Sequence, residues 1–312
     1  MKLPRERLKR SRLFRFAARR LIRVLRPYVR LDHAPGRRAL WHGLVWRLMW
    51  TEGMCRARTR DGARLEVDAS DLVGSYIAYF GVWEPNLTSW LEGRLRPGDV
   101  FVDVGANVGY FTVLASRLVG ESGRVVAVEP SPLANSVLRR NVSANGGENV
   151  RVENVAVWDS SGEVVVFGAS HRIVGGTTLD PAWAARWSLD TQVAVPAEPL
   201  SKLLSDDEVA RTAVLKIDVE GSELQVLEGM EPLLPRLRDD AAIVLELEGD
   251  AVGIATEALG RFGFEAFVIE NDYSADSYLT PRITTPRPLA SPAASHGWQV
   301  DLIFARPHVR PV

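Results

Sequence analysis

Asp103 and Glu129 flank a glycine-containing turn whose residue types suit the binding of a nucleoside. The turn, Asp103-Val104-Gly105-Ala106-Asn107-Val108-Gly109, lies between an apolar run and an amphipathic run. Glycines there let a ligand approach the backbone closely, and the start of a helix offers free N–H groups with a partial positive charge. Glu129 ends the next apolar run, 24 residues after Gly105. The pattern predicts a ligand site at the ends of two strands.

The side chains of this turn narrow the choice of ligand. Dinucleotide-binding turns carry G-x-G-x-x-G, and Asn107 replaces the second glycine, which disfavours a pyrophosphate here. Glu129 can accept both hydroxyls of a ribose, in charge-assisted bonds worth about 1.5–3 kcal/mol each. Asp103 repels phosphate and suits an ammonium group. S-adenosyl-L-methionine combines a ribose and an ammonium without phosphate, so we expect it as the cofactor. The expected binding residues in the turn and after it are Asp103, Gly105, Asn107, Gly109 and Glu129.

Three segments resemble one known family. VFVDVGANVGYFT at 100–112, VVAVEPSP at 125–132 and LKIDVEGSE at 215–223 look like the FkbM-type methyltransferases. The resemblance runs from about Asp71 to Phe304 and includes a Gly-x-x-Glu that ends at Glu84. It implies an S-adenosylmethionine-dependent enzyme of the class I fold that methylates hydroxyl groups on sugars or on secondary metabolites such as macrolides. Glu84 is then expected to close over the cofactor.

Two features depart from the family pattern. Family members often carry Glu-x-His after the fifth strand, whereas this chain has Glu246-Leu247-Glu248. Any role of that histidine as a base is therefore absent. The basic segment at residues 4–30 has no counterpart in the family pattern.

Asp218, Glu220 and Glu246 are the candidate catalytic residues. They follow or end two expected strands, and the carboxyl ends of parallel strands line the crevice where substrates bind. In one interpretation Asp218 or Glu220 takes the proton of an acceptor hydroxyl, a contribution of about 10²–10⁴ in rate. Alignment of oxygen, methyl and sulfur would add about 7–11 kcal/mol. The sequence thus predicts an O-methyltransferase, with N-methylation or methylation of RNA as alternatives.

A metal-assisted reaction is the less favoured interpretation of the same acids. Asp218 and Glu246 would then hold a divalent cation that lowers the pKa of the acceptor hydroxyl. Hard cations need several convergent oxygens, and only two are well placed, so we do not expect a bound metal. Structural roles suit two neighbours: Lys216 pairs with Asp218 or another carboxylate, and Glu223 complements the dipole of the next helix.

Alternating apolar and helical patterns predict the elements that position these residues. Expected strands are 100–104, 125–128, 150–157, 212–217 and 243–247, with closing strands at 263–269 and 299–304. Expected helices include 110–119 and 131–144. Continuous apolar strands separated by helices indicate a mostly parallel α/β sheet with helices on both faces. With the resemblance, this is the seven-stranded Rossmann-like sheet of class I methyltransferases. Residues 163–196, broken by Gly175-Gly176 and Pro181, are expected to form a flap.

Charge divides the 312-residue chain in two. Its net charge is −1, yet residues 1–60 hold 18 lysines and arginines against three acids, while residues 61–312 hold 20 against 36. We expect residues 1–53 to form a basic, aromatic-rich helical extension and residues 54–312 to form the methyltransferase domain. Within that domain, 54–98 should supply a hairpin turning at Asp61-Gly62 and cover helices, and 99–312 the catalytic sheet.

Residues 4–30 predict one basic amphipathic helix. Its expected apolar stripe is Phe14, Ala17, Ala18, Leu21, Leu25 and Tyr28, with arginines on the other face. Such a helix suits an anionic membrane surface, where each cation adds about 1 kcal/mol. Trp41, Trp46 and Trp50 are packing residues or interfacial anchors. Docking on the acidic part of the chain, RNA binding and an organellar transit peptide are the alternatives.

Composition limits the remaining function classes. One cysteine, Cys55, excludes an internal disulfide and indicates a reducing compartment, and the five histidines lack metal-ligand spacing. No apolar run approaches the ~18 residues of a spanning helix. Nucleic acid is not expected as a partner, because the catalytic part is acidic. We therefore expect a cytoplasmic enzyme at the inner face of the membrane, acting on a small-molecule or glycan hydroxyl.

Overall fold

The computed structural model describes residues 12–32, 34–168, 178–186, 188–189, 191–290 and 299–307. The chain forms two compact units. Unit 1 contains Met1–Trp83 and Asp272–Arg282, and unit 2 contains Glu84–Asn271 and Ile283–Val312. The hairpin and the helices that follow it, up to Trp83, lie in unit 1. The domain boundary after residue 53 stays a prediction. The expected helix at 4–11 and the centre of the flap at 169–177 lie outside the described residues.

Unit 1 is built from helices around one β-hairpin. Its helices are α2 (Arg12–Arg30), α3 (Arg37–Leu40), the π-helical turn η1 (Trp41–Val45), α4 (Trp46–Leu48), η2 (Met49–Thr51), α5 (Leu72–Phe80) and α14 (Ala275–Leu279). Strands β1 (Met54–Arg58) and β2 (Arg64–Asp68) pair antiparallel, which confirms the predicted hairpin. Asp71 caps α5 by accepting a hydrogen bond from the Gly74 amide at 2.6 Å.

Aromatic packing forms the centre of unit 1. Trp41 is fully buried, and its ring lies 4.6–6.3 Å from the rings of Tyr76, Tyr79 and Phe80. Such tilted and edge-on pairs are favourable beyond the area they bury. Trp41 is therefore a packing residue, whereas Trp46 is 47% exposed.

Helix α2 covers only part of its apolar surface. Ala18, Ile22 and Val29 face the interior, because α2 packs on α5 and η2 of its own unit. Leu21 and Tyr28 of the predicted apolar stripe are exposed, whereas Ala18 of that stripe is buried. Apolar residues occur on both sides of this helix, so the neighbouring elements decide which side is covered.

Unit 2 contains an eight-stranded sheet in the order β12-β11-β13-β10-β9-β3-β4-β5. Its strands are β3 (Val100–Val104), β4 (Arg124–Val128), β5 (Val150–Glu153), β9 (Thr212–Ile217), β10 (Ala242–Glu248), β11 (Glu265–Ile269), β12 (Arg287–Pro288) and β13 (Gln299–Ala305). Strands β5, β4, β3, β9 and β10 are parallel, and β13 lies antiparallel between β10 and β11. The predicted mostly parallel seven-stranded sheet is confirmed, with β12 as an added edge strand of two residues.

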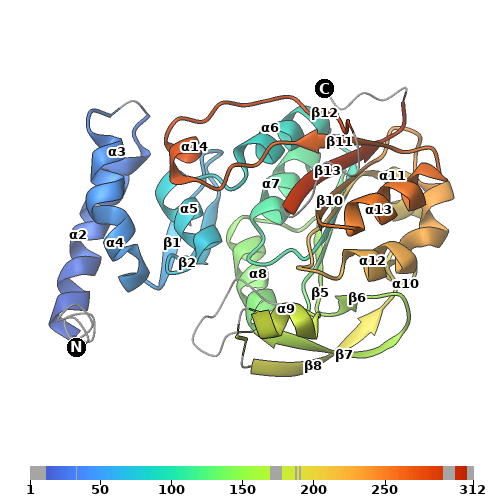
Figure 1. The fold of residues 1–312 in the computed structure, drawn as a ribbon, viewed down its shortest axis with the longest axis horizontal. Helices are drawn as coiled ribbons and strands as arrows, with labels where there is room; N and C mark the ends of the chain where they lie inside the picture. Colours follow the sequence, from blue (N-terminus) through green and yellow to red (C-terminus); the bar gives the residue numbers. More distant parts are fainter. Residues whose placement is uncertain are drawn as a thin grey trace. The chain divides into compact units, whose positions relative to one another are not determined.

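Helices cover both faces of this sheet (Figure 1). They are α6 (Pro85–Arg94), α7 (Tyr110–Val119), α8 (Pro132–Ala144), α10 (Leu200–Leu203), α11 (Asp206–Arg211), α12 (Glu223–Met230), η3 (Glu231–Arg236) and α13 (Ala251–Gly260). Helices α7 and α8 pack on strands β3 to β5, whereas α12 and α13 pack on β10 and β11. A core of Val, Leu and Ile side chains fills the space under α12 and α13.

The expected strand at 150–157 is two strands in two sheets. Asn154 causes the break: its Nδ2 donates to the carbonyls of Glu129 and Pro130, both at 2.9 Å, and turns the chain. Strand β6 (Ala156–Val157) then begins a second sheet with β8 (Thr191–Glu198) and β7 (Gly162–Gly168). The predicted flap is thus an ordered three-stranded sheet in its described parts, and Pro181 begins the short helix α9 (Pro181–Arg186).

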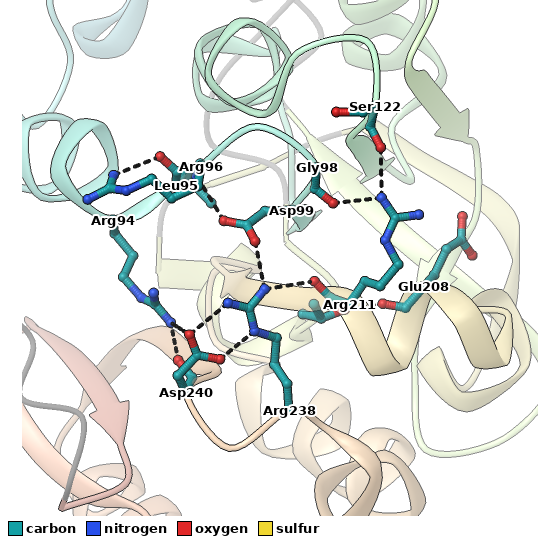
Figure 2. A network of polar contacts seen from close by, with 11 residues as sticks. Arg94, Leu95, Arg96, Gly98, Asp99, Ser122, Glu208, Arg211, Arg238 and Asp240 are labelled. Atoms are coloured by element: carbon teal, nitrogen blue, oxygen red, sulfur yellow. Dashed lines mark hydrogen bonds and ion pairs between the residues drawn. The ribbon is translucent and has the colours of Figure 1, made fainter.

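A network of charges joins the amino ends of the parallel strands (Figure 2). Arg238, before β10, donates to Asp99, before β3, at 2.6 Å and to Asp240 at 2.7 Å. Arg211, at the end of α11, donates to the carbonyls of Gly98 and Ser122. The Arg238 guanidinium lowers the pKa of Asp240 to about 2. These contacts fix the strands at one edge of the sheet and leave the opposite edge to the candidate site.

Candidate active site

Lys216 lies at the centre of the carboxyl edge of the sheet. It is the register neighbour of Asp103 on β3, and its Nζ lies 2.8 Å from Asp218 Oδ2 and 5.1 Å from the Phe111 ring centre. Burial disfavours its ammonium, but the carboxylates of Asp218 and Asp103 together raise the pKa of Lys216 above its ordinary value. Lys216 is a fixed cation of the site and not a proton acceptor.

Asp103 carries an unsatisfied acceptor in this environment. Its Oδ2 accepts a hydrogen bond from Thr112 Oγ1 at 2.5 Å, while its Oδ1 is buried without a partner among the described residues. Burial raises the pKa of Asp103, and Lys216 opposes that shift. A buried acceptor left open is costly, so this position fits an ammonium donor such as the one on S-adenosylmethionine.

The two glycines of the turn are required by protein packing. A Cβ on Gly105, which has φ 80°, would lie 1.7 Å from the carbonyl oxygen of Asp218. A Cβ on Gly109, which has φ 87°, would lie 2.4 Å from Leu138 Cδ1. The expectation that these glycines admit a ligand is therefore only part of the explanation, because the loop after strand β9 and helix α8 already occupy the space.

Glu129 holds the turn that the glycines make possible. Its Oε2 accepts the Asn107 amide at 2.8 Å, and its Oε1 accepts the Ser131 amide at 2.9 Å. Burial raises the pKa of Glu129 to about 7, although both amide donors oppose the shift. Each carboxylate oxygen retains a second lone pair for a ribose hydroxyl. Asn107 also has a buried Oδ1 without a partner in the described part of the chain.

Glu220 and Asp218 lie on the loop that follows β9. Burial, and then the charge of Asp218, raise the pKa of Glu220 to about 8. The Glu220 carbonyl accepts a hydrogen bond from Thr178 Oγ1 at 2.6 Å, so the flap sheet supports this loop. The Asp218 side chain is 26% exposed and is thus accessible to a substrate while Lys216 holds it.

Glu246 faces a carboxyl that the sequence did not single out. Asp301 of β13 is its register partner, and Asn271 Nδ2 donates to Asp301 Oδ2 at 2.6 Å. Burial raises the pKa of Asp301 to about 7 and that of Glu246 well above its ordinary range. Asn271 Oδ1 is buried without a partner among the residues described. A charged residue inside an apolar strand, as at Asp301 and Lys216, is the signal that could have identified both.

Backbone strain gathers at the same site. Four non-glycine residues in the described ranges have positive φ, and three of them are predicted site residues: Glu84 (42°), Asn107 (50°) and Glu220 (52°). This conformation costs about 1–3 kcal/mol per residue and is retained where a site demands it. Glu84 is 4% exposed, and its charge helps to raise the pKa of Lys216. The structure therefore brings all the predicted site residues to one edge of unit 2.

Two further acids have structural partners. Glu223 accepts the Gly221 amide at 3.0 Å, and Glu248, at the family's histidine position, lies 3.5 Å from Arg186 of α9. Within the described residues, no group of three or more His, Cys, Asp or Glu side chains is arranged to hold a metal ion. Asp218 and Glu246 are thus not joined by a third ligand there.

Comparison with known proteins agrees with these features. Residues 103–265 match the family described as the methyltransferase FkbM domain. The 31-O-demethyl-FK506 methyltransferase FkbM of Streptomyces tacrolimicus is 33% identical over 206 residues, which are 57% of this chain and 77% of that protein. Methyltransferase 1 of Beauveria bassiana is 27% identical over 195 residues, again 57% of this chain and 77% of that protein.

Solved structures were also compared. An S-adenosylmethionine-dependent O-methyltransferase from Thermotoga maritima has a TM-score of 0.41 and 15% identity, covering 82% of this chain and 78% of that one. The expected class I methyltransferase fold is confirmed by the sheet order of unit 2 together with the family match.

Proposed function

This chain belongs to the FkbM methyltransferase family, and we propose that it transfers a methyl group from S-adenosylmethionine to a hydroxyl of a glycan or secondary metabolite. The observation that carries the proposal is the half-buried Glu220, with a positive φ, on the loop of the Lys216–Asp218 ion pair. A carboxyl with a pKa of about 8 suits proton removal from a poor nucleophile such as an alcohol. The similar Streptomyces protein is named for a substrate that lacks an O-methyl group.

The buried acceptors of the turn support cofactor binding. S-adenosylmethionine supplies a methyl group activated on a sulfonium when it is bound. Asp103 Oδ1 accepts its ammonium, and Glu129 accepts the ribose hydroxyls while it orients the turn through the Asn107 amide. Gly105 and Gly109 keep that turn in shape. Glu84 lies with these groups around Lys216 and closes the site.

The acids after β9 and β10 act on the acceptor. Glu220, when ionised, takes the hydroxyl proton, and Asp218, anchored by Lys216, accepts a second hydrogen bond from the acceptor. Burial, and then the charge of Asp218, raises the pKa of Glu246 well above its ordinary range, and the protonated form of Glu246 donates a hydrogen bond to the acceptor. No metal is required in this scheme, because Lys216 already provides a fixed positive charge.

The test is methyl transfer from isotopically labelled S-adenosylmethionine to matched acceptor pairs. Each pair is a hydroxylated sugar or macrolide and its amino analogue, and mass spectrometry locates the label. We expect a methyl ether on the hydroxyl acceptor and at least a hundredfold lower rate in Glu220→Gln. Glu248→Gln, which alters an exposed acid paired with Arg186, is the control and should retain its rate. Label on nitrogen, with Glu220→Gln fully active, would establish the N-methyltransferase alternative.

Helix α2 supports a peripheral position at an anionic membrane surface. Its exposed apolar side chains include Leu13 (77%), Phe16 (57%) and Val24 (75%), and arginines flank them in the sequence. Apolar groups that insert among basic ones favour an anionic bilayer over RNA, which offers phosphate but little apolar surface. Among the described residues, no helix has both the length and the apolar character needed to cross a membrane. We place the enzyme at the inner membrane face, where lipid-linked glycan precursors would be accessible.

A further inference from the structure

Arginines line a cavity in unit 1 that the proposed reaction does not use. The cavity has a volume of about 400 Å³, and its walls are Arg26, Arg30, Arg56, Ala57, Arg58 and Arg64. We call it the arginine cavity. Two of these arginines come from α2 and three from the hairpin, so the elements that form it belong to one compact unit.

Arg26 and Arg30 of α2 both contact strand β1, because one turn of helix is about as long as two residues of a strand. Arg26 Nη1 donates to the Arg56 carbonyl at 3.3 Å, and Arg30 Nη2 donates to the Arg58 carbonyl at 2.5 Å. Four helical residues rise about 6 Å, and two strand residues span about 6.6 Å, so both contacts form together. The two guanidiniums thus cover the free edge of β1 and are fixed in position at the cavity.

Two of the hairpin arginines carry like charges at opposing positions of the strand pair. Arg58 lies directly opposite Arg64 in the antiparallel register, and both are exposed. Like charges in directly opposite positions destabilise a strand pair. Arg56 lies on the same face, two residues before Arg58, with Glu66 opposite it. Three arginines of the hairpin thus line one cavity, which concentrates positive charge there.

Backbone carbonyls and one carboxylate hold the two helical arginines. Besides the Arg58 carbonyl, Arg30 donates to the carbonyls of Ala78 at 3.1 Å and Ile77 at 3.0 Å. The fully buried Glu52 pairs with Arg26 and also accepts the Tyr79 hydroxyl at 2.9 Å. Arg26 Nε is buried without an acceptor in the described structure. Among the described residues, no carboxylate lies within ion-pair distance of Arg30. Burial and the neighbouring Arg26 cation lower the pKa of Arg30 to about 10.

We propose that the arginine cavity binds a phosphate group, either of a lipid headgroup or of a soluble phosphate ester. Guanidinium forks bind phosphate oxygens in pairs, and several converging forks select a multiply charged anion over chloride. The aliphatic stems of the arginines supply apolar walls for the organic substituent of the phosphate. This site is separate from the acids of unit 2 and stands whether or not the acceptor proposed above is correct.

The first arm of the test uses inorganic pyrophosphate and the full chain. Calorimetry should detect saturable binding, and the Arg58→Gln/Arg64→Gln variant should bind about tenfold or more weakly. The control, Arg20→Gln/Arg47→Gln, removes the same charge from exposed arginines outside the cavity and should change affinity by about twofold at most. Equal weakening in both double variants, or no binding by the native chain, would overturn the proposal.

The second arm distinguishes the two phosphate sources. The native chain is sedimented with phosphatidylcholine vesicles that contain or lack phosphatidylglycerol, in the presence and absence of pyrophosphate. Vesicle binding that pyrophosphate displaces identifies the lipid phosphate. Pyrophosphate binding in solution, with no vesicle binding that pyrophosphate displaces, identifies a soluble ester. Both results support the cavity as a phosphate site. Vesicle binding that pyrophosphate does not displace, together with no pyrophosphate binding in solution, contradicts it.

Thermal unfolding separates loss of binding from loss of structure. Arg58 and Arg64 are exposed, so the double variant should retain the native fold and a Tm close to that of the native chain. Pyrophosphate should raise the Tm of the native chain and leave that of the variant unchanged. If pyrophosphate raises the Tm of the native chain and of the double variant equally, the anion binds outside the arginine cavity, and the proposal is wrong.

Discussion

Glu246 of β10 lies directly opposite Asp301 of β13, so a half-buried carboxyl and a buried one are register partners at the substrate edge of the sheet. Strand β13 runs antiparallel to its neighbours β10 and β11. Burial is the main cause of the raised pKa of both groups, and the charge of Asp218 adds to it. A carboxyl of this pair donates a hydrogen bond in its protonated form and only accepts in its ionised form.

Asp301→Asn should stabilise the fold, and increasingly so as the pH rises. The raised folded-state pKa of Asp301, about 7, means that its destabilising contribution begins near pH 4 and is complete above pH 7. Asn keeps an oxygen for the Asn271 amide. We expect a gain of about 2–4 kcal/mol at pH 8 and a smaller one at pH 5. Urea unfolding at both pH values measures it, and a gain independent of pH would contradict the assignment.

The pH dependence of methyl transfer should reveal Glu220. A base with a pKa of about 8 is mostly protonated at pH 6, so the rate at saturating cofactor should rise about tenfold per pH unit up to pH 8 and then level. Glu220→Gln should lose this limb together with most of the activity. A native profile that is flat between pH 6 and 8 would exclude Glu220 as the base.

Glu129→Gln should weaken binding of S-adenosylhomocysteine by about 2–4 kcal/mol, roughly 30- to 1,000-fold. In the native protein Glu129 accepts hydrogen bonds from the backbone amides of Asn107 and Ser131. Gln keeps the size of the side chain, but its NH₂ group faces one of these two N–H donors and cannot accept from it. Calorimetry on the variant and on the exposed control Glu121→Gln measures the difference. An unchanged dissociation constant in Glu129→Gln would remove this residue from the cofactor site.

Local patterns in the sequence carry much of this fold. The apolar strand at 100–104, the turn that ends at Gly109 and the hairpin that turns at Asp61-Gly62 depend on neighbours within a few residues, and each lies where the pattern predicts it. Long-range register is different. Asp301 meets Glu246 only because the last strand inserts between two earlier ones, and nothing near Asp301 in the sequence specifies that partner.

Two other features escaped prediction for related reasons. Helix α2 carries apolar residues on both sides, so only its contacts with α5 and η2 decide that Ile22 is buried and Leu21 is exposed. The packing role of Gly105 depends on the Asp218 carbonyl, which is more than a hundred residues away and reaches the turn through a neighbouring strand. The sequence therefore shows that α2 is amphipathic and that Gly105 lies in a turn, but it does not show which residues contact them in the fold.

Arg238→Gln should destabilise the fold by about 1–3 kcal/mol at pH 7, because it leaves Asp99, which is 10% exposed, without its cation. Asp240 is 39% exposed, so solvent screens its ion pair with Arg238, and the pair contributes little to the free energy of unfolding. The lowered pKa of Asp240, about 2, stabilises the native fold above pH 4 and is lost as the pH falls toward 2. The variant should therefore differ less from the native chain at pH 2.5 than at pH 7.

Urea unfolding at the two pH values checks this, with Arg236→Gln as the control. Arg236 pairs with Asp206, which is 93% exposed, so its loss should cost less than about 0.5 kcal/mol. If Arg238→Gln lowers the free energy of unfolding no more than Arg236→Gln does, the network of Figure 2 does not hold the strands together.

The exposed stripe of α2 should control binding to anionic vesicles. Leu13→Ser/Val24→Ser keeps every arginine and removes two apolar side chains, 77% and 75% exposed, that the fold itself leaves uncovered. Insertion of each contributes about 1.5–3 kcal/mol at full burial, so co-sedimentation with phosphatidylglycerol-containing vesicles should fall about tenfold or more. Leu72→Ser, which alters another exposed apolar residue of unit 1, is the control and should sediment like the native chain.

Pyrophosphate binding separates the apolar contact from the phosphate site. It should be unchanged in Leu13→Ser/Val24→Ser, because the arginine cavity is intact in that variant. Equal sedimentation of the native chain and Leu13→Ser/Val24→Ser would show that charge alone brings the protein to the bilayer and that the stripe faces another partner.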